Sequence, residues 1–392
     1  MMVPDSMSAE HELLLLLARR TLTPDLQARA RLLACGPISW PVFIRQAVEH
    51  GVFPLACRNL GRLGWCAVPE EAHAELMAAS RLNAAQNALW RRELLGLLRM
   101  FHGAGIRVIP LKGVALAQSL YTDATLRVCS DLDVLVPRDA VAESLRLLLA
   151  NGYAHAEKHQ VEPAEVDRLL DSNMEYGFSG RTAGFEYLLE LHWDIAWRWR
   201  ADTGMVDDLW ADARPGTIFG VDTWTLSPEW ELLYLAVHAA RHRWSALKWL
   251  VDLHEVCVRG GFDWGGVEHR ARRFGLERAL HQSLGACRLL LGTPLPPELE
   301  GQAPPRRLRV LDAGPVTVGG WGEVLSAVRL FPRPADKLRY LGRILLQPAL
   351  AEWRLLRLPR VLRFIYYPLR PVRLGLTTSR AMVRAGRARM NL

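Results

Sequence analysis

Strand-like patterns in this chain are concentrated between about residue 106 and residue 226, and helical periodicity flanks this stretch on both sides. The predicted strands share alternating or β-branched apolar residues; they are residues 106–109, 131–136, 174–178, 185–191 and 223–226. Such short strands need helices to cover their apolar faces. We therefore expect an α/β (α+β) fold in which a small mixed sheet lies between helical regions.

The helical patterns divide the chain further. Ser227, Pro228 and Glu229 predict a helix start, with serine as N-cap, proline at the first helical position and glutamate in the first turn. A proline-rich break follows near residue 300. The expected regions are an N-terminal helical region (1–98), a core that contains the sheet (99–226), a C-terminal helical region (227–300) and a proline-broken basic helical tail (301–392).

Positive charge is concentrated in the tail. Residues 337–392 contain 13 of the 49 Lys and Arg residues and one of the 41 acids, so this segment has a net charge of +12 and the rest of the chain −4. Such asymmetry favours contact with an anionic membrane surface, nucleic acid or a phosphorylated partner. The alternative is a helix packed on the body with an arginine-rich outer face, which Pro359, Pro368 and Pro371 favour because they interrupt any long amphipathic helix.

The cellular compartment is predicted from what the sequence lacks. The six cysteines form no Cys-x-x-Cys pair, which is typical of free thiols in a reducing compartment. No secretory signal opens the chain, and no apolar stretch of about 18 residues could span a bilayer. We expect a cytoplasmic protein that associates peripherally with the inner membrane face if the tail binds lipid.

Two carboxylates on the predicted strand 131–136 are candidate metal ligands. Asp131 and Asp133 are separated by one residue, so both side chains point to the same face of a strand, with Cβ atoms roughly 7 Å apart. Oxygen ligands of this kind suit Mg²⁺ or Mn²⁺. A solvated strand face would explain the same spacing.

The turn upstream of these acids is a candidate phosphate site. Lys112 and Gly113 lie between the predicted strand 106–109 and an apolar helical stretch, residues 114–121. Glycine lets the backbone approach a phosphate, the helix N-terminus offers free N–H groups, and lysine adds a positive charge. Many strand-to-helix turns use glycine for geometry alone.

Glu190 is a candidate third acid, because it lies between leucines on the predicted strand 185–191. If this strand lies beside the one that carries Asp131 and Asp133, three acids converge and can hold two cations. Glu190 is then also a candidate base. His192 shares its face if the strand is regular, where it could orient a carboxylate or serve a structural role.

Three motifs follow one another along the chain: Leu-Lys-Gly-x-Ala-Leu at 111–116, Arg-x-x-x-Asp-x-Asp-x-Leu-Val at 127–136 and Glu-Leu-His-Trp at 190–193. Their combination resembles the uncharacterised nucleotidyltransferase family related to AbiEii-type toxins, in the DNA polymerase β-like nucleotidyltransferase superfamily. The resemblance extends over roughly residues 38–255.

This resemblance implies that residues 99–226 form a nucleotidyltransferase core. The core would transfer a nucleoside monophosphate from an NTP to an acceptor and release pyrophosphate, with Asp131, Asp133 and Glu190 holding Mg²⁺ or Mn²⁺. Lys112 and Gly113 would contact the nucleotide phosphates. Val114 departs from the turn of polymerase β-like enzymes, which usually have glycine or serine at this position. A lost serine hydroxyl costs roughly 1–3 kcal/mol if its hydrogen bond is charge-assisted. A sugar, a peptide and RNA remain open as acceptors.

Further candidates lie near these motifs. Arg127 and Ser130 are candidates for nucleotide binding, and Arg127 is equally a candidate partner for the acids. Trp193, Trp197 and Trp199 could stack on a base, although tryptophans at such spacing are more typical of a core.

The helix predicted after Ser227 supplies three candidates for a substrate pocket, His238, Arg241 and His242. His192, at the end of the predicted strand 185–191, is a fourth candidate. The i, i+4 spacing of His238 and His242 also suits zinc, but no third ligand is evident. Asp252 is a candidate cap or ion-pair partner for one of these side chains.

Two other functions fit the same residues. A catalytically inactive relative would bind nucleotide or a partner through the same pocket. A membrane-recruited accessory protein of a biosynthetic gene cluster would act through the basic tail instead.

Overall fold

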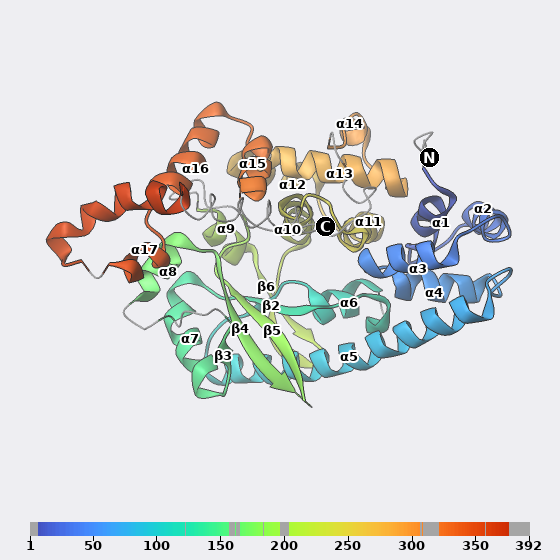
Figure 1. The fold of residues 1–392 in the computed structure, drawn as a ribbon, viewed down its shortest axis with the longest axis horizontal. Coiled ribbons are helices and arrows are strands. Elements are labelled where there is room, and N and C mark those ends of the chain that lie inside the picture. The colour runs from blue at the N-terminus through green and yellow to red at the C-terminus, as the bar shows by residue number, and fades with distance from the viewer. Residues whose placement is uncertain are drawn as a thin grey trace, which may run out of the picture.

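Buried apolar side chains form two clusters in the computed structural model of this protein. One surrounds the sheet, and the other lies among helices from both ends of the chain (Figure 1). The structure describes residues 7–375 except residues 122, 157–160, 162–164, 183, 197–203, 306–307, 309–320 and 357. The expected α/β (α+β) class, with a small mixed sheet between helical regions, is confirmed.

Five strands form the sheet in the order β1-β2-β5-β4-β3 (Figure 1). They are β1 (Ile109–Pro110), β2 (Asp131–Leu135), β3 (Ala154–His155), β4 (Glu175–Thr182) and β5 (Phe185–His192). β2 and β5 are parallel, and the other neighbours are antiparallel. The parallel pair places Asp133 directly opposite Glu190, and β4 places Glu175 opposite His192. This register brings residues far apart in the sequence into one row.

The predicted strand at 106–109 is wrong in its position, because β1 starts only at Ile109. The preceding carbonyl, that of Val108, accepts hydrogen bonds from the Trp224 N–H and the Thr223 Oγ1 instead. These two residues lie in β7 (Val221–Thr225), which pairs with β6 (Arg214–Ile218) as a separate two-stranded sheet. The predicted strand at 223–226 therefore exists but does not join the five-stranded sheet.

Helices from the two ends of the chain share one core. The N-terminal helices are α1 (Ala9–Leu17), α2 (Pro24–Ala34), α3 (Trp40–Glu49), α4 (Phe53–Arg62) and α5 (Glu70–Gly103). The C-terminal helices are α10 (Pro228–Arg241), α11 (Leu247–Arg259), α12 (Trp264–Phe274), α13 (Glu277–Leu291) and α14 (Pro297–Glu300). The helix start predicted at Ser227 is confirmed, since its side chain accepts a hydrogen bond from the Trp230 N–H.

The longest helix, α5, connects the two clusters. Its first turns contribute Ala72 and Leu76 to the helical cluster, and its last turns contribute Leu94 and Phe101 to the cluster around the sheet. In Figure 1 it runs along one side of the sheet, opposite the C-terminal helices. It extends past position 98 to Gly103.

Shorter elements connect these parts. They are α6 (Gly113–Tyr121), η1 (Ala124–Leu126), η2 (Arg138–Ala140), α7 (Val141–Ala150), α8 (Val166–Ser172) and α9 (Met205–Asp212). Among them, α6 follows β1 and begins at the Lys-Gly turn, and η1 precedes β2, the strand that carries the two aspartates.

The tail packs on the body at the end of the molecule opposite the N-terminal helices (Figure 1). Its elements are α15 (Trp321–Leu330), α16 (Pro334–Leu346), α17 (Leu350–Leu355) and η5 (Arg360–Ile365), followed by helical residues 366–375. Arg354 pairs with Glu165, and Arg370 and Arg373 both pair with the buried Glu352.

Among the described residues of the tail, the outer face is only partly the arginine-rich face expected of a packed helix: Arg339 is 63% exposed, but other arginines are paired with acids. Arg354, Arg370 and Arg373 point to acids, whereas apolar side chains face solvent, with Val361 79%, Phe364 66% and Val372 59% exposed. Within the described ranges, no helix is both long and apolar enough to span a bilayer.

Candidate active site

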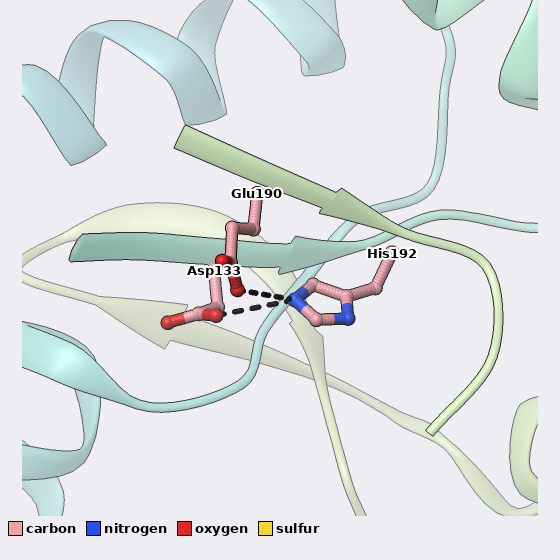
Figure 2. Close-up of side chains that lie close together, drawn as sticks. All are labelled: Asp133, Glu190 and His192. Carbon is pink, nitrogen blue, oxygen red and sulfur yellow. Dashed lines mark hydrogen bonds and ion pairs between the residues drawn. The ribbon is translucent and has the colours of Figure 1, made fainter. Parts of the chain in front are cut away.

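Asp133, Glu190 and His192 converge at the junction of β2 and β5 (Figure 2). The His192 Nε2 lies 3.1 Å from the Asp133 Oδ1 and 3.4 Å from the Glu190 Oε2. One donor atom from each of the three side chains lies within 4.8 Å of the others, close enough to hold one metal ion. Residues some sixty positions apart therefore meet because β2 and β5 are adjacent and in register.

Lys112 lies between the two aspartates of β2. Its Nζ is 3.1 Å from the Asp133 Oδ1 and 3.5 Å from the Asp131 Oδ2, so the two carboxylates share a face of the strand as expected. Burial opposes the charge on Lys112, but the carboxylates raise its pKa. Burial likewise opposes the charge on Asp133, which is 2% exposed, yet the Lys112 ammonium and the His192 imidazole hold the pKa of Asp133 well below its usual range.

Gly113 has a backbone conformation that favours glycine. Its φ is +65°, and an added Cβ would lie 3.2 Å from the main-chain oxygen of Asp131. The residue begins α6, so the turn brings a helix N-terminus next to the first residue of β2. Ser130, just before that strand, donates from its Oγ to the Asp131 Oδ1 at 3.2 Å.

Glu175 is a part of this cluster that the sequence reasoning missed. Its Oε2 lies 3.1 Å from the His192 Nδ1 and 3.5 Å from the Arg241 guanidinium. Burial opposes its charge, but His192 and Arg241 lower the pKa of Glu175 to about 2. An acid among the apolar residues of predicted strand 174–178 was the available signal, and only the β4–β5 register identifies its partner.

His192 is surrounded by three carboxylates. Burial lowers the pKa of its imidazole, but hydrogen bonds to these carboxylates raise the pKa well above its ordinary value. Burial, together with the charge of Asp133, raises the pKa of Glu190. Positive charge on Lys112 and His192 therefore compensates the acids in this structure.

The donor atoms present fit a divalent cation. The Asp133 Oδ2 is buried and has no hydrogen-bond partner among the described residues, although a buried carboxylate oxygen normally has one. Glu190 and His192 place two more donors nearby. Asp131 is not in this group, but the shared contact with Lys112 keeps its carboxylate close to that of Asp133.

Arg127 has a partner other than the acids of β2. Its guanidinium makes hydrogen bonds to both Asp252 carboxylate oxygens at 2.8–3.1 Å, and the Tyr121 hydroxyl donates to the Asp252 Oδ1 at 2.7 Å. All three side chains are buried. Asp252 therefore joins α11 to the segment that leads into β2, rather than pairing with His238, Arg241 or His242 as expected. A contact of Arg127 with nucleotide would require this pair to open.

His238 of α10 and His242, which caps the C-terminus of that helix, lie near the cluster. Burial lowers the pKa of His238 well below its ordinary value and, with the charge of Arg241, lowers that of His242 to about 3. The Trp249 ring lies 4.7 Å from that of His242 and 5.5 Å from that of His238, measured between centroids. The described residues place no third zinc ligand with these two histidines.

The tryptophans predicted after Glu190 are only partly described. Trp193 is buried, and its indole N–H donates to the main-chain oxygen of Asn173, which supports a core position. Trp197 and Trp199 lie outside the described residues.

The sheet and its acidic cluster define a mixed α/β protein with a candidate metal-binding active site. The sequence matches the model of a family described as uncharacterised nucleotidyltransferase over residues 36–292, and the chain belongs to that family. A search among curated proteins finds no match.

Among the solved structures, an antigenic nucleotidyltransferase-like protein from Paracoccidioides brasiliensis is similar in part. It is 16% identical, the alignment covers 53% of this chain and 94% of that one, and the TM-score is 0.35. A TM-score this low supports no conclusion about the site.

Proposed function

We propose that this protein transfers a nucleoside monophosphate from an NTP to an acceptor and releases pyrophosphate. The observation that carries the proposal is the position of Asp133, which lies opposite Glu190 on a parallel strand and beside Lys112. The acceptor oxygen forms a bond to the α-phosphorus, the bond from that phosphorus to the β-bridging oxygen breaks, and pyrophosphate leaves. The acceptor proton passes to the Glu190 carboxylate.

In this proposal Asp131, Asp133 and Glu190 hold Mg²⁺ or Mn²⁺. The cation would supply positive charge to the phosphate oxygens and lower the pKa of the attacking hydroxyl. Lys112 and the N–H groups that follow Gly113 hold the nucleotide phosphates. His192 orients the carboxylates of Asp133 and Glu190 through its Nε2. His238, Arg241 and His242 border the substrate side of the cluster.

A substitution at Asp133 tests the activity. Purified protein with Mg²⁺, a panel of NTPs and candidate sugars, peptides and RNAs should release pyrophosphate. Asp133→Asn should lower that release at least about a hundredfold, since a ligand to the metal is lost. Asp139→Asn, on the exposed start of η2, is the matched control and should leave it unchanged. Release that survives Asp133→Asn would refute the assignment.

A catalytically inactive relative would behave differently in a binding experiment. Calorimetric titration with an NTP should show tighter binding in the presence of Mg²⁺ if the acids hold a cation. Binding that is equal with and without Mg²⁺, and equal in Asp133→Asn, would favour nucleotide binding without catalysis.

We also propose that the tail contacts an anionic membrane surface. The exposed apolar side chains between residues 355 and 372 support this, because exposed apolar groups on a basic segment insert among lipid acyl chains while basic groups attract lipid phosphates. Sedimentation with vesicles that contain phosphatidylserine should retain the protein, and neutral vesicles should retain less.

Two variants replace an exposed apolar side chain with serine, one in the tail and one in α5. Phe364→Ser should lower the vesicle-bound fraction, whereas Leu82→Ser, at a leucine of α5 that is 67% exposed, should not. Equal binding of both variants would contradict a lipid contact through the tail.

A further inference from the structure

Lysine is rare in this chain. Only four of the 49 Lys and Arg residues are lysines, at positions 112, 158, 248 and 337. Two of them, Lys112 and Lys248, lie near Asp131, and the proposed transfer gives a role only to Lys112. A lysine ammonium is a compact point charge on a flexible stem, whereas arginine offers a planar fork, so the two are not interchangeable at a phosphate site. Lys248 is thus a second candidate for a phosphate contact.

The packing around Lys248 directs its side chain to the start of β2. Lys248 lies in the first turn of α11, and its main-chain N–H donates to the oxygen of His50 at 3.1 Å. Its stem passes Gly51, where an added Cβ would lie 2.8 Å from the Lys248 Cδ. The Nζ lies 3.5 Å from the main-chain oxygen of Val128, three residues before Asp131. The ammonium is therefore placed next to the segment that leads into the aspartate strand.

The turn of Lys112 and Gly113 reaches the same end of β2 from α6. The Lys112 Nζ lies 3.5 Å from the Asp131 Oδ2, and an added Cβ at Gly113 would lie 3.2 Å from the main-chain oxygen of Asp131. Burial lowers the pKa of Lys248. The charge of Asp131 opposes this effect, whereas the charges of Arg127 and Lys112 add to it. Lys112 and Lys248 are thus electrostatic neighbours at the Asp131 end of the strand.

Lys248 differs from its charged neighbours because it has no acid partner. Other positively charged side chains around the acids each contact a carboxylate within 4.0 Å; they are Lys112, Arg127, His192 and Arg241. Lys248 makes no ion pair with any carboxylate that the structure describes. It is partly buried, and removing an ammonium from water without a counter-charge costs free energy that a bound anion offsets. A positive charge beside the acids therefore remains for a ligand.

We propose that Lys248 binds the β- and γ-phosphates of the NTP and then the pyrophosphate that leaves. These phosphates lie between the Lys112–Gly113 turn and α11. The acceptor oxygen bonds to the α-phosphorus, the bond from that phosphorus to the β-bridging oxygen breaks, and its electron pair stays on pyrophosphate. Lys248 compensates the charge that pyrophosphate gains, and the acceptor proton passes to Glu190. The proposal rests on the proposed nucleotidyl transfer.

Inorganic tripolyphosphate tests this contact without the transfer reaction. Calorimetry on the full chain in a buffer with Mg²⁺ should detect its binding. Lys248→Gln should weaken this binding about tenfold or more, because a charge-assisted contact is lost. Glutamine still offers an N–H to the Val128 oxygen, so a purely structural role of Lys248 would leave binding unchanged. Lys248→Arg, which keeps the charge, should weaken binding less than Lys248→Gln.

Lys337→Gln is the matched control. Lys337 of α16 is also partly buried, and it makes no ion pair with a residue in the described ranges. This substitution should leave tripolyphosphate binding unchanged. No detectable binding by the wild-type protein, or equal binding by wild type and Lys248→Gln, would overturn the proposal.

Chemical protection tests the same contact in the wild-type protein, so it does not depend on the folding of a variant. Tripolyphosphate with Mg²⁺ should slow the acetylation of Lys248 by acetic anhydride and leave that of Lys337 unchanged, as measured by mass spectrometry of peptides. Equal rates at Lys248 with and without tripolyphosphate would contradict the proposal.

The pyrophosphate assay separates the Lys248 contact from the reaction itself. Lys248→Gln should lower kcat/KM for the NTP about tenfold or more, and Lys337→Gln should not. Wild-type kcat/KM in Lys248→Gln would contradict the phosphate contact. Tripolyphosphate binding that Lys248→Gln weakens, without any pyrophosphate release by the wild type, would contradict the transfer and support the phosphate site.

Discussion

Gly113 shows at the scale of one residue how backbone geometry supports the site. Gly113 and Gly64 both have positive φ, but only Gly113 has a neighbouring backbone atom within 4 Å of an added Cβ. We expect Gly113→Ala to lower the free energy of unfolding by about 1–3 kcal/mol and to reduce pyrophosphate release, because the turn must move away from Asp131. Gly64→Ala should show the backbone cost alone. Urea denaturation measures the loss of stability, and the pyrophosphate assay measures the loss of activity. Equal pyrophosphate release by Gly113→Ala and Gly64→Ala would contradict the prediction.

The Arg127–Asp252 pair is the second prediction at this scale. Asp252→Asn should lower the free energy of unfolding by about 3–5 kcal/mol, because Arg127 would remain buried without a compensating charge. The double variant Arg127→Met with Asp252→Leu should recover much of that loss. The exposed pair of Arg181 and Glu186 is the control, and Glu186→Gln should change stability by less than about 1 kcal/mol. Denaturant midpoints with unchanged m values would measure the stability of Asp252→Asn, of the double variant and of Glu186→Gln. Equal losses of stability in Asp252→Asn and Glu186→Gln would contradict the prediction.

Single residues differed in how well the sequence indicated their surroundings. Asp131, Asp133 and Lys112 are close together in the chain, so strand periodicity and a turn were enough to predict that they share a face. The sequence did not indicate the partners of Glu175 and Asp252, because those partners are on strands or helices that only tertiary packing brings near. The roles of Asp131, Asp133 and Lys112 in nucleotide transfer stay predictions.

At the scale of elements, Gly180 determines how β4 and β5 pack. It lies opposite Tyr187, and an added Cβ would lie 2.4 Å from the tyrosine ring. Tyr187 in turn donates to Glu93 of α5. Gly180→Ala should therefore lower the free energy of unfolding by about 1–3 kcal/mol, because the ring must leave its place against α5.

The same substitution on α5 should have the opposite sign. Gly96 is an exposed helical glycine with open space around it, and Gly96→Ala should raise the free energy of unfolding by up to about 1 kcal/mol through helix propensity. Thermal or urea unfolding of the two variants compares them directly. A stabilised Gly180→Ala protein would show that Tyr187 is free to move.

The whole molecule should become less stable in mild acid. Burial lowers the pKa of His50 and of His254 from 6.5 to about 4 each, so between these values the unfolded chain binds protons that the folded chain does not. Stability is then full above pH 6.5 and falls as pH decreases toward 4, by about 1.4 kcal/mol per pH unit for each such proton. His254→Gln should flatten this dependence, whereas His102→Gln, at an exposed position of α5, should not. Unfolding free energies at several pH values measure the slope, and an unchanged slope in His254→Gln would contradict the assignment.

The sequence alone determined the local features of this protein: the class of fold, the strand that carries Asp131 and Asp133, the Lys-Gly turn, the helix start at Ser227 and the family to which the chain belongs. These depend on periodicity and on residues near one another in the chain. Tertiary structure decided the parallel pairing of β2 with β5, the position of Glu175, the Arg127–Asp252 pair and the ion pairs of Arg354, Arg370 and Arg373 in the tail. Each of these joins residues tens to hundreds of positions apart, and which pairs form depends on how buried surfaces and charges fit together in the folded chain.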